Sequence, residues 1–209
     1  MSEVAEVVEV VEQPDLEFEQ KLDKTKFTVF RLDGHSFSRF TSCFTKPFDS
    51  GFTTAMKKTA ETAFTYYNFS LGFVGSDEIT LCIFPKLSEK TKELCDIEFN
   101  GRVEKMTSLL AGFVSVVFYK EFEKFYPMND YTPHFDCRVF QLDSFEQVKS
   151  NIGSRIKYTL RNSRMMFAQH YYSAKQLHKL SSSLAVQKLL DEKGIIVFKQ
   201  IKWIFNRFF

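Results

Sequence analysis

The sequence predicts an α+β fold of the ferredoxin-like kind, in which the order βαββαβ forms one antiparallel sheet with helices on one face, followed by a helical C-terminal extension. Three observations predict this fold. Four segments are rich in β-branched and aromatic residues, two of them are joined by a tight turn, and two long stretches repeat their apolar residues every three or four positions. At 209 residues the chain is long enough for one hydrophobic core, but not for two large domains.

The first half of the repeat contains three strands and one helix. Gly34 ends a first strand that is apolar on both faces, as expected of a central strand. A loop precedes the helix, which Asp49 or Ser50 is predicted to cap. The turn Gly75-Ser76 joins the next two strands into a hairpin. These elements are predicted as a strand over 27–33, a loop through residue 47, a helix through residue 67, and strands over 69–74 and 79–84.

The second half begins with a long amphipathic helix and ends in shorter helices. Apolar residues at helical spacing predict the long helices, and Gly153 is expected to interrupt the second of them. Ser173 and Ser181 are candidate caps for shorter helices, and Gly194 is a stop signal. The elements are predicted as a helix over 100–125, a strand over 135–142 and a helix over about 144–172.

Charge is distributed unevenly along the chain. Residues 1–20 hold seven acids and no Lys or Arg, which predicts a flexible acidic arm and is the reverse of a secretory or mitochondrial leader. The formal charge of the whole chain is +2, so the remaining residues carry +9. This charge suits a polyanionic partner, or it is that of an ordinary solvated surface.

No apolar stretch is long enough to predict a membrane span. Four widely spaced cysteines without zinc-ligand spacing predict free thiols in a reducing compartment, and we expect a cytoplasmic protein.

Carboxylates are predicted to gather at one end of the sheet. In the predicted topology, the first strand lies beside the hairpin, so Asp33 and the pair Asp77-Glu78 converge. Oxygen ligands of this kind suit Mg²⁺, and two such ions can activate an attacking hydroxyl and stabilise a leaving pyrophosphate. The alternative is that Asp33 and Asp77 only end strands in turns, where Asp is common.

The loop after the first strand is a candidate phosphate site. Exposed backbone amides of residues 34–38 can cradle phosphate oxygens, although an ordinary strand-to-helix loop explains one glycine equally well. Lys46 can contact a triphosphate as a mobile charge, or it can be an ordinary surface lysine.

Several short motifs, in order, resemble the tRNA-His guanylyltransferase family. The resemblance covers roughly residues 25–195 and extends to the branch called tRNA-His guanylyltransferase-like proteins. The motifs that carry it are Asp33-Gly-His-Ser-Phe, Phe44-Thr-Lys-Pro-Phe-Asp49, Gly75-Ser-Asp-Glu-Ile79, Phe99-Asn-Gly-Arg-Val-Glu-Lys-Met106, Phe135-Asp-Cys-Arg-Val139, Arg161-Asn-Ser163, Leu177-His-Lys-Leu-Ser-Ser-Ser183 and Glu192-Lys-Gly194.

The resemblance implies a reverse polymerase that adds nucleotides to the 5′ end of tRNA. It implies a polymerase-palm catalytic domain over residues 21–143 with the helical extension, residues 144–209, packed on it. Asp33, the Gly34 carbonyl and Asp77 would hold two Mg²⁺ ions, and Glu78 would support the site. ATP or GTP would serve as activating and donor nucleotides, and the protein is expected to be a homotetramer built as a dimer of dimers. The residues implied in nucleotide binding are Asp33, Gly34, His35, Ser36, Phe37, Ser38, Lys46, Ser76 and Asp77, and those implied in tRNA binding are Arg161 and Asn162.

Departures from the family pattern leave other functions open. His35 and Ser38 stand where many relatives carry other residues. The aromatic, basic residues 198–209 differ from the usual ending; they suit a packing or interface strand, and the alternative is that their rings stack on bases. Leu160-Arg-Asn-Ser163 replaces the His-Ile-Asn-Asn element of eukaryotic enzymes, which favours templated 5′-end repair over obligatory guanylation of histidine tRNA. The alternatives are a catalytically idle tRNA-binding module and a palm-type nucleotide cyclase.

Overall fold

The computed structural model describes residues 20–127 and 131–197. Most of the predicted acidic arm and the aromatic residues 198–209 therefore lie outside the described residues. The strands are β1 (Phe27–Gly34), β2 (Leu71–Gly75), β3 (Glu78–Ile83) and β4 (Phe135–Leu142). The helices are α1 (Phe37–Phe40), α2 (Ser50–Tyr66), α3 (Val103–Glu123), α4 (Phe145–Tyr171), α5 (Ala174–Leu177) and α6 (Ser182–Lys193), with 3-10 turns at Thr41–Cys43 and Glu98–Gly101.

The four strands form one sheet in the order β2-β3-β1-β4, and each neighbouring pair is antiparallel. This order and the sequence of elements confirm the predicted ferredoxin-like fold. Because β1 lies between β3 and β4, a residue on β1 has a direct partner on each side. At its end, Asp33 pairs with Glu78 on β3 and with Asp136 on β4. The three side chains therefore lie on the same face of the sheet.

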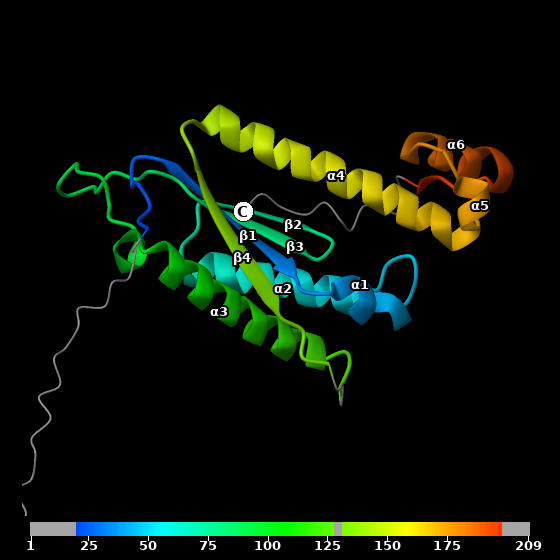
Figure 1. The fold of residues 1–209 in the computed structure, drawn as a ribbon, viewed down its shortest axis with the longest axis horizontal. Coiled ribbons are helices and arrows are strands. Elements are labelled where there is room, and N and C mark those ends of the chain that lie inside the picture. Colours follow the sequence, from blue (N-terminus) through cyan, green and yellow to red (C-terminus); the bar gives the residue numbers. More distant parts are fainter. Residues whose placement is uncertain (1–19, 128–130, 198–209) are drawn as a thin grey trace, which may run out of the picture.

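Helices cover both faces of the sheet (Figure 1). The two helices of the βαββαβ repeat, α2 and α3, pack on one face, where Phe30, Leu32, Met56 and Phe118 are fully or almost fully buried. On the other face, α4 packs over a smaller core of five buried residues: Val29, Phe73, Cys82, Val148 and Ile152. The C-terminal extension therefore begins with the helix that closes the second face.

The loop after β1 differs from the prediction, because it contains α1 and a 3-10 turn before Pro47. Phe37 and Phe40 lie three residues apart in α1, and both side chains are buried in the larger core. Burial of these two rings fixes the short helix, although its length alone would not make it stable.

Helix α4 also differs from the prediction, because it continues through Gly153 without a break. One glycine costs a helix about 1 kcal/mol, and the burial of apolar residues on both sides of it outweighs that cost. The predicted caps are confirmed: the side chains of Asp49, Ser173 and Ser181 accept hydrogen bonds from backbone amides of the helices they precede, and Gly194 ends α6 with a φ of 65°.

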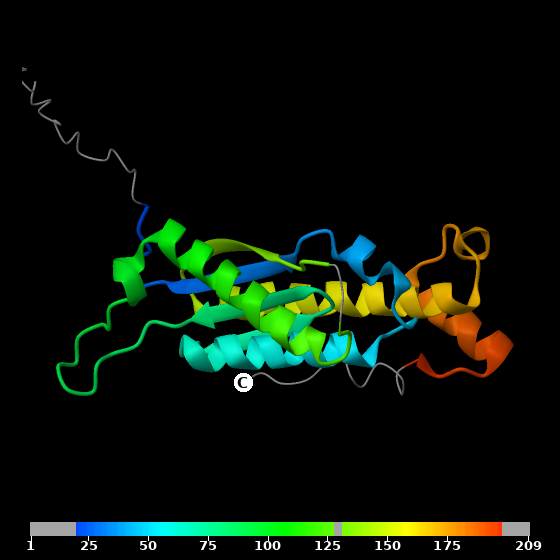
Figure 2. The same cartoon turned by 90° about the horizontal axis from the view of Figure 1, so that it is seen from below.

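The short helices form a separate cluster with the end of α4. Phe167 and Leu189 are buried in this cluster, and Phe48, from the loop before α2, packs against Phe167 with 6.1 Å between ring centroids. Figures 1 and 2 show α1 and α6 toward the same end of the elongated molecule. None of the helices in the described ranges is long and apolar enough to cross a membrane.

Candidate active site

Asp33 and Asp77, which lie 44 positions apart in the sequence, come together at one end of the sheet. Asp33 is at the end of β1, and its strand partner Glu78 directly follows Asp77. The amide of Gly34 donates a hydrogen bond to the carbonyl oxygen of Asp77 at 3.1 Å. Ser76 makes the sharp turn of the hairpin with a φ of 57°, a left-handed conformation that is uncommon for a residue other than glycine. The structure thus joins two residues that the sequence analysis assigned to one site.

Negative charge is concentrated around Asp33. Burial raises the pKa of the Asp33 carboxyl, and the nearby charges of Asp77, Asp136 and Glu78 raise it further. Arg138 opposes this effect, with its Nη2 atom 3.6 Å from the Asp33 carboxylate. The Arg138 side chain is 64% exposed, so water screens this pair. A bound cation would relieve the repulsion among these carboxylates.

Glu78 is held by arginines and does not face the cleft as a free acid. Its buried carboxylate accepts a hydrogen bond from Arg155 Nε at 2.9 Å and a second from Arg155 Nη2. Arg31 Nε lies 3.7 Å from the same carboxylate, too far for a hydrogen bond. Arg31 in turn donates a hydrogen bond to the Asn151 side chain of α4 at 2.9 Å. Glu78 therefore links the sheet to α4, and any support that it gives to the site passes through these arginines.

Two cavities meet at the hairpin turn and share Ser76, Asp77 and Asn162. The first, which we call the polar cleft, has a volume of about 470 Å³ and lies between the sheet and α4. Its remaining lining residues are Arg31, Asp33, Gly75, Glu78, Arg138, Arg155, Tyr158 and Thr159. Gly75 permits this arrangement, because a Cβ atom there would lie 2.5 Å from the Thr159 hydroxyl of α4.

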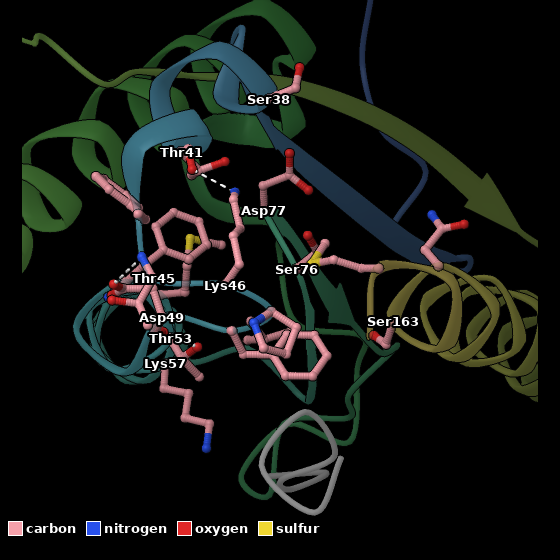
Figure 3. Close-up of a pocket in the computed structure, with 18 residues that line it drawn as sticks. Ser38, Thr41, Thr45, Lys46, Asp49, Thr53, Lys57, Ser76, Asp77 and Ser163 are labelled. Atoms are coloured by element: carbon pink, nitrogen blue, oxygen red, sulfur yellow. Dashed lines mark hydrogen bonds between the residues drawn. The ribbon is translucent and has the colours of Figure 1, made fainter. Parts of the chain in front are cut away.

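The second cavity, which we call the loop pocket, has a volume of about 230 Å³ and lies between α4 and the loop that carries Lys46. Aromatic and aliphatic side chains form most of its wall, among them Phe44, Phe48 and Met166. Figure 3 shows Lys46 with its hydrogen bond to the Thr41 carbonyl, at 2.8 Å, and Ser163 of α4 on the opposite side. The structure therefore places Ser38, Lys46, Ser76 and Asp77, four of the predicted nucleotide-binding residues, around one pocket.

The other predicted nucleotide-binding residues lie in the turn that follows β1. The Phe37 side chain is buried among other rings, so only its backbone can serve a nucleotide. His35 is exposed and stacks on His134 with ring centroids 4.8 Å apart. The amides of Gly34 and His35 already donate to the carbonyls of Asp77 and His134, which removes them from the predicted phosphate cradle. The predicted tRNA-binding residues separate: Asn162 lines both cavities, whereas the exposed Arg161 lines neither.

Sequence reasoning missed Asp136, Arg31 and Arg155 as parts of this site. Asp136 follows from the strand pairing, because the predicted strand over 135–142 must pair antiparallel with β1 and so faces Asp33. Arg155 lies three residues after Ile152 on the face of α4 that packs on the sheet. A charged residue on a buried helix face requires a partner, and this signal was present in the sequence.

The fold and the site together define a class of protein, a palm-like α+β domain with an acidic site at one end of its sheet and a cavity on each side of the hairpin turn. Residues 8–143 match the tRNAHis guanylyltransferase family, and the chain belongs to that family. Its members are tRNA nucleotidyltransferases, so the chain is an enzyme of this class.

Similar proteins include viral, plant and bacterial relatives. The chain is 28% identical over 224 residues to an uncharacterised protein of Acanthamoeba polyphaga mimivirus. This alignment covers 96% of this chain and 76% of the viral protein. It is 27% identical over 146 residues to tRNA(His) guanylyltransferase 2 of Arabidopsis thaliana, over 66% of this chain and 25% of that protein.

Solved structures show the same fold. A bacterial tRNA(His) guanylyltransferase-like protein in complex with ATP matches with a TM-score of 0.79 and 26% identity, over 87% of this chain and 76% of that one. The tRNA(His) guanylyltransferase of Saccharomyces cerevisiae matches with a TM-score of 0.69 and 22% identity, over 86% and 82% of the two chains.

Proposed function

We propose that the chain is a Mg²⁺-dependent 3′-to-5′ nucleotidyltransferase that extends the 5′ end of tRNA, and that it acts in templated 5′-end repair. The observation that carries this proposal is the position of Asp77 where the two cavities meet, with Asp33 beside it in the polar cleft. Such a reaction has two partners, a nucleotide with a 3′-hydroxyl and an RNA with an activated 5′ phosphate. Each cavity can receive one partner, and the reacting groups would then meet beside the aspartates.

The residues present fit magnesium. Asp33, Asp77 and the Gly34 carbonyl are oxygen donors, which Mg²⁺ prefers, and the raised pKa of Asp33 indicates negative charge that a cation would balance. Within the described ranges, no three Asp, Glu, His or Cys side chains gather closely enough to hold an ion alone. Phosphate oxygens and water would complete the coordination, as is usual for Mg²⁺. When bound, Mg²⁺ lowers the pKa of an attacking hydroxyl and neutralises charge on the phosphates.

The protein's own side chains bind and orient the two partners. The largely apolar wall of the loop pocket suits a nucleotide base, and Lys46 can leave the Thr41 carbonyl to contact the phosphates of that nucleotide. In agreement with this assignment, bacterial relatives of the same fold bind ATP or GTP. Arg138 and Arg155 in the polar cleft suit the phosphorylated end of an RNA. Glu78 holds Arg155 in place and so positions it for this contact.

A 5′-extension assay tests the proposal directly. We would incubate the protein with 5′-truncated tRNAs, labelled nucleoside triphosphates and Mg²⁺, and measure incorporation. We expect incorporation by the wild-type protein and loss of it in Asp77→Ala. Asp96→Ala is the matched control, because Asp96 is an exposed partner of Lys24 and lines neither cavity.

The outcomes separate the alternatives. RNA binding without incorporation would support an idle tRNA-binding module, and cyclic nucleotide formation without RNA extension would support a cyclase. Incorporation that survives unchanged in Asp77→Ala would exclude the proposed site.

A further inference from the structure

Tyr158 is an aromatic side chain in the wall of the polar cleft with no partner ring. It lies on α4, lines the cleft beside Asp33 and Asp77, and is 47% exposed. Within the described part of the chain its hydroxyl makes no hydrogen bond, and its ring stacks on no other aromatic ring. This exposure leaves part of the ring accessible to a ligand that enters the cleft.

Two arginines flank the ring along the helix. The guanidinium carbon of Arg155 lies 4.7 Å from the Tyr158 ring centroid, and that of Arg161 lies 5.8 Å from it. They are three residues before and three residues after Tyr158, so they approach from neighbouring turns. Both distances are within the range of a cation–π contact.

The two arginines differ in how firmly they are held. Arg155 is fixed by its two hydrogen bonds to Glu78. Arg161 is exposed, and its contact with the Tyr158 ring is the longer of the two. A ligand can therefore displace Arg161 from the ring, whereas displacing Arg155 would leave the buried Glu78 without its closest counter-charge.

The charge of the helix indicates which ligand would bind. Residues 150–171 of α4 contain four Lys or Arg residues and no Asp or Glu. These four are Arg155, Lys157, Arg161 and Arg164. A row of cations beside an exposed aromatic ring is the pattern that binds single-stranded nucleic acid, in which phosphates contact the cations and a base stacks on the ring. A free nucleotide needs no such row.

We infer that Tyr158 is the stacking surface for the base at the 5′ end of the RNA substrate, and that Arg161 closes over this base or pairs with its phosphate. This inference rests on the proposed function, because it assigns the polar cleft to the RNA end and the loop pocket to the nucleotide. It places the terminal base beside the aspartates, where its 5′ phosphate is within reach of an attacking hydroxyl.

The test uses a 5′-truncated tRNA with 2-aminopurine as its first nucleotide, because stacking on a tyrosine quenches the fluorescence of this base. We would titrate the full-length protein and record quenching and affinity without Mg²⁺. We expect wild-type protein and Tyr158→Phe to quench the probe. We expect Tyr158→Ala to lose the quenching and to bind the RNA about tenfold more weakly, the loss typical of one stacked base. Circular dichroism would show that both variants are folded.

Tyr171→Ala is the matched control, because Tyr171 is a tyrosine of the same helix that is 39% exposed and lies outside both cavities. It should quench as the wild-type protein does. Full quenching by Tyr158→Ala would overturn the inference, and so would a defect of this variant confined to a free 2-aminopurine nucleoside triphosphate. The outcome is distinct from that of the extension assay, because quenching is measured without turnover.

Discussion

Replacement of Glu78 by Gln should destabilise the protein strongly, because it removes the negative charge that two arginines share. The Glu78 side chain is only 10% exposed, and those of Arg31 and Arg155 are 18% and 26% exposed. Removing one partner of a buried ion pair costs about 3 to 5 kcal/mol, since the remaining charge stays buried without compensation. Arg31 is especially vulnerable, because its Nε atom is buried and already lacks a hydrogen-bond partner. We expect a loss of about 3 kcal/mol in the free energy of unfolding.

Urea unfolding followed by circular dichroism measures this loss, with Glu61→Gln as the matched control. Glu61 pairs with Lys58 at 3.4 Å on the surface, where such a pair contributes less than about 1 kcal/mol. High salt should reduce the small effect at Glu61 and leave the effect at Glu78 largely unchanged, because buried pairs are poorly screened. A loss below about 1 kcal/mol for Glu78→Gln, or a loss that salt abolishes, would show that the pair behaves as a surface pair. The reasoning from burial would then be wrong.

Three further predictions concern Asp49, Gly34 and Asp33. Burial raises the pKa of Asp49, but hydrogen bonds from the Phe52 amide and other donors outweigh it and hold the pKa below 3.8. Asp49→Ala should therefore cost about 1 kcal/mol at neutral pH, and urea unfolding should show this cost shrinking as the pH falls through the depressed pKa. A Cβ atom at Gly34 would lie 2.4 Å from the Phe37 ring, so Gly34→Ala should lower the melting temperature and weaken ATP binding in equilibrium dialysis, whereas Gly112→Ala, with nothing within 4 Å, should do neither. Because burial and neighbouring carboxylates raise the pKa of Asp33, its charged form opposes folding above that pKa. Asp33→Asn should therefore raise the melting temperature at neutral pH in EDTA, with a gain that disappears in acid; a lower melting temperature would contradict this reasoning.

The convergence of Asp33 and Asp77 could be predicted from local patterns alone. A central strand, a helix and a tight hairpin in that order have few possible topologies, so the end of the first strand must lie near the hairpin turn. The sequence did not predict how Glu78 differs from its neighbour Asp77. Asp77 lies in the turn and Glu78 begins β3, so the two neighbours differ in backbone context, and the partner of each depends on what packs against it.

Helix α4 decides that difference. Its own periodicity predicts the helix, but nothing local predicts that it crosses the second face of the sheet and brings Arg155 to Glu78. The same packing forms the polar cleft and exposes Tyr158 inside it. These features depend on contacts between residues 77 positions apart, and such contacts leave no periodic signal in a single sequence.

The sequence by itself determined the order of the four strands and the long helices, the helix caps and the two aspartates at one end of the sheet, because hydrogen-bond geometry and apolar periodicity act over a few residues. Only the tertiary structure decided that the Glu78 carboxylate is bound by arginines whereas Asp77 lies where the two cavities meet. The free energy of a charged group depends on its burial and its partners, and both are set when distant segments pack together.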